Sequence, residues 1–521
     1  MSTLRTASKI SLLTMVSRAL GFLRDILMLR MLGATGAGTF LFAWLLPNIF
    51  RRLFGEGALT TAFIPAFTSA LRDPDRDSAR HLLASVSGIL LLGLSSLTAV
   101  VLFCWLLLPF DWFSGRGEAE DNGALFLDLA AILFPYVILI CLIGVYSGAL
   151  HSLSVFAIPA TLPIVLNVFW IGGLLIASVV HANDGPGTSI WLAGFLLAGG
   201  LCQLSIVALT LWQRGYLARP RLPQKGDPAW GVFVIMLPTL LSMSLVQINS
   251  LVDQSIAFFV IAPEANSHVF LANRLLLFPH AITSLALATA AFPKMVVLGS
   301  NAQNDDLRHK VNDTIGLTLW LTIPASIGLI LVSSEFIDLF FAHGRFTDED
   351  ARWSSLTTAT LVAGLPFIGA GQLYVRAMIS LSNRQTPAIL AAWMVPLNLL
   401  LSLGFVLGLG MGVPGLTLGS SVCALLNVIL LKRSFHALCP GKSIGLKSLA
   451  HIAIATTAMA LVVYATGNIF SAESDLQRGL LRLGLPITVG IACYAGVMWM
   501  VGDPTIRRLW RPIRALWKKT P

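Results

Sequence analysis

Hydrophobic residues in this chain form long uninterrupted blocks rather than alternating or helical stripes. The block over residues 87–110, for example, exceeds the roughly 18 apolar residues that indicate a transmembrane helix. The pattern predicts an all-α integral membrane protein with fourteen transmembrane helices, and a short helix over 57–71 after the second. The predicted segments are 10–32, 38–55, 81–110, 124–150, 157–181, 188–213, 230–262, 268–298, 313–342, 353–381, 386–410, 414–433, 446–469 and 479–502.

The composition agrees with a chain that has almost no soluble mass. It is 56% hydrophobic and 12% charged, whereas a soluble protein of this length is about 25% charged. The six cysteines are scattered, mostly within apolar segments, without a CxxC pair or a metal-ligand spacing. We therefore expect core cysteines, and neither a cofactor nor a bound metal.

Basic residues outside the predicted helices are strongly asymmetric. If the amino terminus is cytoplasmic, most of them fall on the cytoplasmic side, from Arg5 and Lys9 to the basic tail 507–519. The opposite side holds only Arg116, Arg345, Arg352, Arg478 and Arg482. The positive-inside rule then places both termini in the cytoplasm. This rule also accounts for the net charge of +10, which is thus no argument for nucleic-acid binding.

The chain also resembles itself at an offset of roughly 229 residues. FLFAWLLPNIF (40–50) is similar to FLANRLLLFPH (270–280), and TTAFIPAF (60–67) to ATAAFPKM (288–295). Because the repeat unit has six helices, an even number, both copies share one orientation and form two parallel repeats. We expect an N-lobe over 1–225, a C-lobe over 226–440, and two extra helices with a basic tail over 441–521.

Seven arginines remain inside the predicted membrane segments. Together they would cost on the order of 20 kcal/mol in lipid, more than the stability of a typical domain, about 5–15 kcal/mol. They are Arg18, Arg24, Arg30, Arg51, Arg52, Arg274 and Arg376. We expect Arg30 to reach the outer surface. We interpret the other six as a cluster of unpaired arginines that binds an anion between the lobes, since a guanidinium matches phosphate and carboxylate. The alternative is that they only bond helix ends and carbonyl groups, and it is strongest for Arg376.

Acidic and small polar residues accompany these arginines. Ser17 and Arg24 share one helix face, and Asp25 lies on a neighbouring face. We expect Ser17 to bind the substrate with Arg24, and Asp25, Glu56 and Arg376 to line the cavity or take part in coupling. Arg52 and Glu56 have the i, i+4 spacing of an ion pair.

A lone carboxylate in the seventh predicted helix is a candidate for coupling. Asp253 is the mate of Arg24 at the repeat offset, and burying it as an anion is costly. It either pairs with a substrate-binding arginine when substrate is absent, or binds sodium or a proton within its own lobe. The first role is favoured, because a carboxylate near an arginine stays charged and takes up a proton poorly.

Three stretches, SRALGFLRD (17–25), LPNIFRRLFGEGALTTAFIPAF (46–67) and FFAHGRFTDEDA (340–351), resemble the MurJ (MviN) family of lipid II flippases. That family belongs to the multidrug/oligosaccharidyl-lipid/polysaccharide exporter superfamily. The resemblance implies a transporter, not an enzyme, in the bacterial cytoplasmic (inner) membrane. It would move the undecaprenyl-pyrophosphate-linked peptidoglycan precursor lipid II to the periplasmic leaflet by alternating access.

The resemblance also implies roles for particular residues and partners. The family's diphosphate-binding arginines map onto Arg18, Arg24, Arg51 (or its neighbour Arg52) and Arg274, and helices thirteen and fourteen would form a groove for the polyprenyl tail. The implied partners are lipid II and membrane lipids, with sodium and a proton both open as coupling ions.

Two other functions remain as alternatives. One is an exporter of another lipid-linked oligosaccharide or of drugs from the same superfamily, although export of cations favours buried carboxylates over arginines. The other is a membrane enzyme acting on polyprenyl phosphates, which needs clustered acidic and histidine residues. His151, His280 and His343 are instead dispersed along the chain.

Overall fold

The computed structural model of this chain describes residues 2–55, 57–73, 76–107, 119–180, 184–441, 445–467 and 475–502. All regular structure in these ranges is helical, and twelve helices are long and apolar enough to cross a membrane. The chain divides into two compact units, one of residues 1–267 and 344–346, the other of 268–343 and 347–521. The lobe boundaries expected from the repeat stay predictions.

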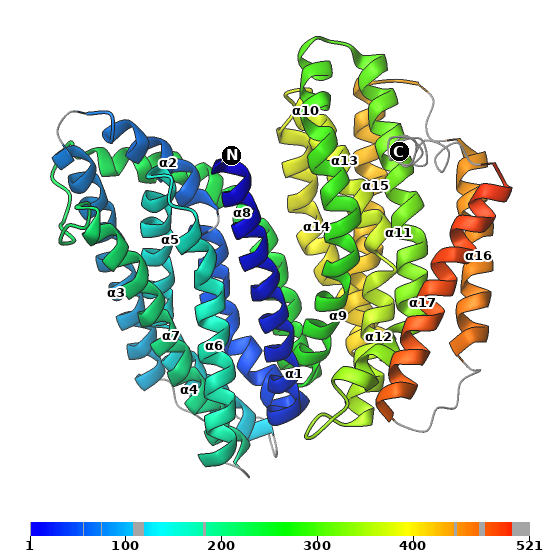
Figure 1. The fold of residues 1–521 in the computed structure, drawn as a ribbon, viewed down its shortest axis with the longest axis horizontal. Helices are drawn as coiled ribbons and strands as arrows, with labels where there is room; N and C mark the ends of the chain where they lie inside the picture. Colours follow the sequence, from blue (N-terminus) through cyan, green and yellow to red (C-terminus); the bar gives the residue numbers. More distant parts are fainter. Residues whose placement is uncertain are drawn as a thin grey trace. The chain divides into compact units, whose positions relative to one another are not determined.

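The first unit is a helical bundle, drawn in blue to green in Figure 1. Its elements are α1 (Ser2–Phe50), the π-helical turn η1 (Arg51–Gly55), α2 (Ala58–Ala70), α3 (Arg76–Leu107), α4 (Ala119–Leu133), α5 (Tyr136–Ser152), α6 (Ala157–Val180), α7 (Gly185–Gln213), α8 (Pro228–Ser255) and the π-helical turn η3 (Ile256–Ile261). The short helix expected over 57–71 is confirmed as α2.

The first two predicted membrane segments lie on α1 and η1, and α1 bends sharply at Gly33 between them. This glycine has a φ of 70° and a ψ of −178°, a conformation that side-chain-bearing residues rarely adopt. The candidate span is 47 residues long, over Ser8–Phe54, or about 70 Å at 1.5 Å per residue. That length is about twice the hydrocarbon thickness of a bilayer.

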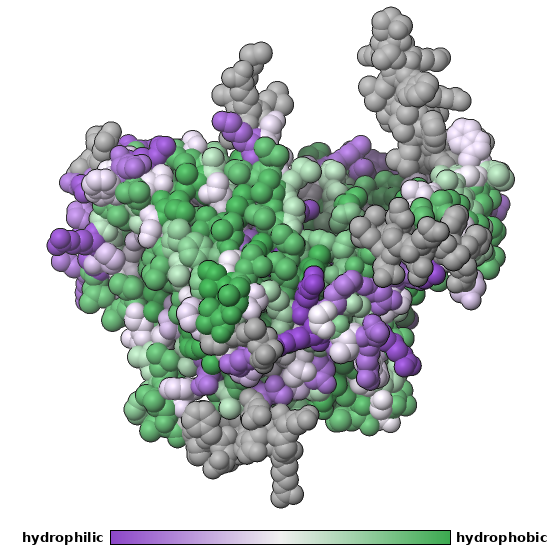
Figure 2. Space-filling model, turned by 60° about the horizontal axis from the view of Figure 1, so that its bottom comes forward, coloured by the Kyte–Doolittle hydropathy of each residue, from purple (hydrophilic) through white to green (hydrophobic). Residues whose placement is uncertain are grey.

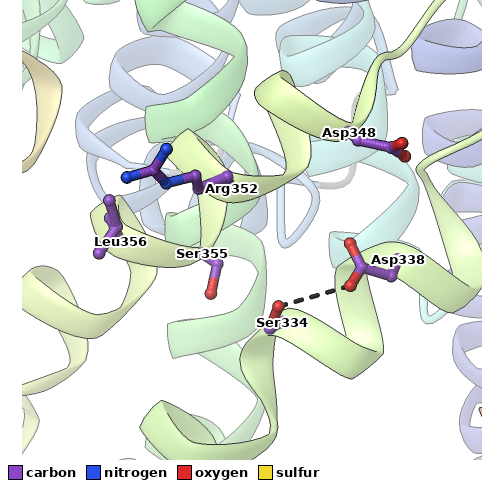
Figure 3. A pocket seen from close by; sticks show the side chains of 6 residues that line it. All are labelled: Ser334, Asp338, Asp348, Arg352, Ser355 and Leu356. Carbon is purple, nitrogen blue, oxygen red and sulfur yellow. Dashed lines mark hydrogen bonds between the residues drawn. The ribbon is translucent and has the colours of Figure 1, made fainter.

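The second unit is also a bundle, drawn in green to red in Figure 1. It consists of α9 (Ala265–His280, from His268 on), η4 (Ala281–Leu285), α10 (Ala286–Ser300), α11 (Asn304–Phe340), α12 (Asp348–Val362), α13 (Leu365–Ser380), α14 (Gln385–Leu403), η5 (Gly404–Gly408), α15 (Val413–Leu438), α16 (Leu446–Gly467) and α17 (Asp475–Met500). A pocket opens where α11 ends and α12 begins (Figure 3).

Small polar residues hold helices of the second unit close together. The hydroxyl of Ser421 on α15 donates to the carbonyl oxygen of Thr360 on α12 at 2.6 Å. The hydroxyls of Thr360 and Thr417 also lie 2.6 Å apart. Such hydrogen bonds hold helices together in a membrane. Apolar side chains alone do not, because they contact lipid tails as favourably as they contact another helix.

The last two helices pack against α11 around an apolar cluster that includes Val332, Met459 and Tyr494. The Tyr494 hydroxyl donates to the Trp320 carbonyl oxygen at 2.8 Å. The basic tail 507–519 and Glu56 lie outside the described residues.

Several predicted segments are interrupted in the structure. The segment 124–150 is divided into α4 and α5 before Tyr136, next to Pro135, and 353–381 is divided into α12 and α13 at Ala363 and Gly364. The segment 230–262 changes from the α-helix α8 to the π-helical turn η3 at Ile256. Proline removes one backbone donor and clashes with the preceding turn, which explains the first break.

The surface of the helices is broadly apolar. Figure 2 shows hydrophobic residues over much of the visible face, with hydrophilic residues gathered in smaller areas. Leu106, Val179 and Val234 have exposed fractions of 71%, 82% and 71%. Water would oppose such exposure, whereas lipid would not. The long apolar helices and their apolar exterior are those of a multi-pass membrane protein.

Candidate functional site

The candidate site of the first unit centres on Arg24, near the middle of the first half of α1. Its guanidinium contacts the carboxylate of the adjacent Asp25, with Nε and Nη2 at 2.9 and 2.6 Å from Oδ1. Asp25 is completely buried, whereas 16% of the Arg24 side chain is exposed. The expectation of a cluster of unpaired arginines is therefore wrong for Arg24, because burying it is compensated by a neighbouring charge.

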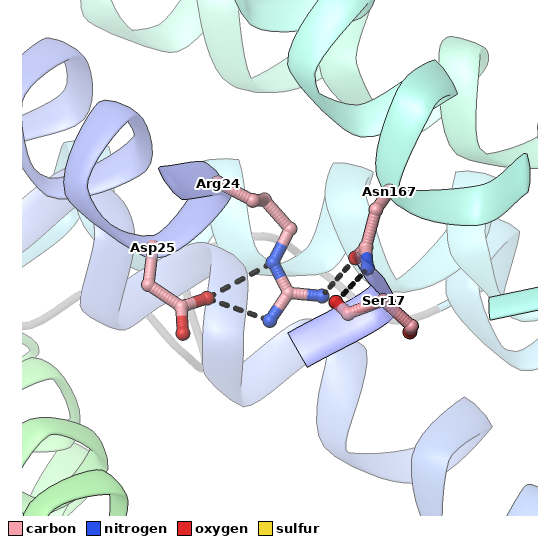
Figure 4. Close-up of polar contacts among 4 residues, drawn as sticks. All are labelled: Ser17, Arg24, Asp25 and Asn167. Carbon is pink, nitrogen blue, oxygen red and sulfur yellow. Dashed lines mark hydrogen bonds and ion pairs between the residues drawn. The ribbon is translucent and has the colours of Figure 1, made fainter. Parts of the chain in front are cut away.

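Helix α6 holds the same guanidinium from the other side. Arg24 Nη1 donates to Asn167 Oδ1 at 3.1 Å, and Asn167 Nδ2 donates to the Ser17 carbonyl oxygen at 3.1 Å (Figure 4). Asn167 thereby links two turns of α1 through one side chain. Ser17 and Arg24, which the sequence placed on one helix face, thus meet the same residue of α6.

An aromatic ring completes the surroundings of Arg24. The guanidinium carbon lies 4.5 Å from the centroid of the Trp170 ring, the distance of a cation–π contact. Trp170 is itself 2% exposed and packs edge-on against Phe40 and Trp44. Sequence reasoning missed Trp170 and gave Asn167 no role at Arg24. The available signal was a lone amide in the otherwise apolar run TLPIVLNVFW (161–170).

Arg24 retains hydrogen-bonding capacity in this arrangement. An arginine has five N–H donors, and three of them bond Asp25 and Asn167. Among the residues that the structure describes, the other two donors have no protein acceptor, and the side chain is partly exposed. The surrounding residues thus hold a guanidinium in one orientation with two donors available to an anionic oxygen.

The other predicted residues of the first unit lie elsewhere on its helices. Arg18 is exposed on α1, and Arg52 is exposed on η1. Arg51 is half-buried, and its Nε and Nη2 lie 3.1 and 3.0 Å from Asn48 Oδ1. The expected pairing of Arg52 with Glu56 involves a residue outside the described part of the chain. Asp253 is half-buried on α8, where Asn249 Nδ2 donates to its Oδ2 at 3.2 Å.

Two predicted arginines belong to the second unit. Arg274 is half-buried on α9. Arg376, on α13, donates to the Thr289 hydroxyl at 3.3 Å, and its guanidinium carbon lies 5.7 Å from the centroid of the Phe292 ring. Both partners of Arg376 are on α10, so this arginine connects two helices.

Comparisons of this sequence with known proteins agree on one family. The model of the family described as "Lipid II flippase MurJ" matches residues 28–482. A protein of Bdellovibrio bacteriovorus named probable lipid II flippase MurJ is 29% identical, with 96% of this chain and 94% of that protein covered. A protein of the same name from Vibrio cholerae is also 29% identical, with 96% of each chain covered.

Solved structures show a shared fold. A lipid II flippase MurJ in an inward closed conformation superposes with a TM-score of 0.75 at 24% identity, covering 96% of this chain and 99% of that chain. An inward-facing multidrug resistance MATE family transporter of the MOP superfamily gives a TM-score of 0.65 at 15% identity. This superposition covers 80% of the present chain and 94% of the transporter chain.

Proposed function

This chain belongs to the lipid II flippase MurJ family, and we propose that it moves lipid II from the cytoplasmic to the periplasmic leaflet of the bacterial inner membrane. The carrier lipid of such a precursor ends in a pyrophosphate, a dense anion that must enter the apolar layer during transport. A guanidinium suits this group because it stays charged and offers paired donors.

The observation that carries this proposal is the arrangement around Arg24. Asp25, Asn167 and Trp170 hold its guanidinium, and two of its donors remain available. A donor that is already oriented loses little conformational entropy when the anion binds. We assign Arg24 to the pyrophosphate, with Ser17 and Asp25 as supporting residues.

Further arginines complete the proposed set of substrate contacts. Arg18, Arg51, Arg52 and Arg274 are proposed to bind the pyrophosphate or its neighbouring sugar, and Arg376 and Glu56 to serve the transport cycle. The proposal also includes fourteen membrane crossings, two parallel six-helix repeats with two added helices, cytoplasmic termini, and transport by alternating access.

Depletion of this protein in its host tests the proposed substrate. Lipid II is expected to accumulate in the inner leaflet, and purified protein in vesicles should restore its transfer to the opposite leaflet. Accumulation of a different lipid-linked sugar, with lipid II at its normal level, would assign the chain to the export of another substrate.

Asp253 is proposed to pair with a substrate-binding arginine when the substrate is absent. Replacing it by asparagine should strengthen lipid II binding by about twofold to fivefold, the size of one partly screened charge interaction. Binding and flipping would be measured at several sodium concentrations and pH values. Neither should depend on sodium or pH more in the variant than in the wild type.

Asn249→Ala is the matched control, because it removes the side-chain hydrogen bond from residue 249 to Asp253 and leaves the carboxylate charge in place. It should bind lipid II as the wild type does. Steep sodium dependence in the wild type, lost in Asp253→Asn without any other change, would instead identify Asp253 as an ion ligand.

A further inference from the structure

A pocket of about 430 Å³ in the second unit has no role in the proposed transport site. It is formed where the end of α11 meets the first turns of α12. Its lining residues are Ser334, Asp338, Asp348, Arg352, Ser355 and Leu356. Positively charged, negatively charged and hydroxyl side chains therefore line the same pocket.

The charged groups of this pocket do not neutralise each other. Among the described residues, the Arg352 guanidinium makes no ion pair with Asp338 or Asp348, although Asp348 and Arg352 have i, i+4 spacing. In the view of Figure 3, the Arg352 guanidinium and the Asp338 carboxylate lie on opposite sides, with the hydroxyls of Ser355 and Ser334 between them. The pocket thus presents separated positive and negative groups.

Among the described residues, the side chains that line the pocket make only two hydrogen bonds, both long. The Ser334 hydroxyl is 3.4 Å from Asp338 Oδ2, and the Ser355 hydroxyl is 3.1 Å from that of Ser333. Each carboxylate has room for several donors. A ligand would consequently find donors on one side and acceptors on the other.

The position of the pocket along α11 places it at the membrane surface. The run 315–332 has no charged residue and is about 27 Å long at 1.5 Å per residue, close to the hydrocarbon thickness. Ser334 and Asp338 lie about 3 and 9 Å beyond its end. Helical side chains lean toward the amino terminus of their helix, so the Asp338 carboxylate lies nearer to the end of the uncharged run than its backbone does.

Apolar surface borders the pocket on its α12 side. Trp353 and Leu356 are 38% and 44% exposed and lie one and four residues after Arg352 on α12. Exposed tryptophan is typical of the level at which headgroups meet acyl chains. A ligand with a charged head and an apolar body therefore suits this location better than a soluble one.

We propose that this pocket binds the headgroup of an ethanolamine phospholipid, with Arg352 contacting the phosphate and Asp338 and Asp348 the ammonium. Arginine is well suited to phosphate. A primary ammonium has three N–H donors, which match two carboxylates and the pocket hydroxyls. A trimethylammonium headgroup has none of these donors, and a glycerol headgroup has no positive charge for the carboxylates.

The test uses the purified full-length chain in detergent and a short-chain phosphatidylethanolamine. Binding is measured by native mass spectrometry and by the shift in unfolding temperature. Wild type should bind this lipid about tenfold or more tightly than phosphatidylcholine or phosphatidylglycerol of the same chain length. Asp338→Asn and Arg352→Gln should each lose most of that preference, since each removes a charge-assisted hydrogen bond.

Matched controls lie outside the pocket on the same unit. Asp306→Asn changes an exposed carboxylate in the first turn of α11, and Arg384→Gln an exposed arginine before α14. Both should bind the lipid as the wild type does. Lipid II binding should be unchanged in Asp338→Asn, which separates this site from the transport site.

Four outcomes would overturn the lipid assignment. Equal binding of the three phospholipids, or equal binding by wild type and pocket variants, would show that the pocket does not recognise the headgroup. Glycerophosphoethanolamine binding as tightly as the phospholipid would identify a site for a soluble zwitterion. Protection by calcium chloride alone, dependent on Asp338 and Asp348, would identify a cation site.

Discussion

Arg24→Ala should lower the rate of lipid II flipping by at least about 100-fold. The variant loses two available donors to the pyrophosphate, and each charge-assisted hydrogen bond contributes roughly 1.5–3 kcal/mol. Flipping would be measured with purified protein in vesicles, and function in cells by growth with the variant as the only flippase. Arg24→Lys should rescue poorly, because an ammonium lacks the planar pair of donors.

Loss of folding must be separated from loss of substrate binding in this experiment. Arg24→Ala leaves the fully buried Asp25 without the guanidinium that pairs with it, and breaking a buried ion pair costs about 3–5 kcal/mol. The double variant Arg24→Ala/Asp25→Asn removes both charges, so it should recover most of the stability and still fail to flip lipid II.

Arg30→Ala is the matched control on the same helix. Arg30 is exposed, and its backbone carbonyl oxygen, which accepts a 2.9 Å hydrogen bond from the Arg345 N–H, remains in the variant. Flipping should stay near the wild-type rate. Normal growth with Arg24→Ala, or flipping by the double variant, would refute the assignment of Arg24 to the substrate.

Gly38→Ala is expected to lower the stability of the first unit by about 1–3 kcal/mol, the usual cost of overpacking. A Cβ at this position would overlap the carbonyl oxygen of Pro263 and lie 3.3 Å from the Glu264 Cα. Both are backbone atoms, so they cannot move aside as a flexible side chain would. The apparent unfolding temperature in detergent should fall by several degrees.

Gly36→Ala provides the comparison for this prediction. It lies two residues earlier on the same helix, and its added Cβ would meet only the Leu32 Cβ at 3.4 Å, an ordinary contact. Alanine is also the better helix former by roughly 1 kcal/mol, so this variant should be as stable as the wild type or slightly more so. If both variants lose stability equally, close packing against Pro263 is not the cause.

The sequence by itself determined the class of the protein, most positions of its helices and its family. The free energy of transfer into a membrane is summed over about 20 consecutive residues, so blocks of apolar residues predict helices without knowledge of their neighbours. Even α2, a short helix over Ala58–Ala70, followed from local pattern. Two of the stretches that carried the resemblance, 46–67 and 340–351, lie within the residues 28–482 that the family model later matched.

Only the tertiary structure decided what surrounds each charge. Adjacent residues on a helix do not normally face each other, so the pairing of Arg24 with Asp25 could not be expected from their spacing. Asn167 and Trp170 reach Arg24 from α6, far along the chain. Which helix packs against α1 depends on side-chain shapes and contacts over the whole bundle, and a local sequence pattern contains no information about those partners.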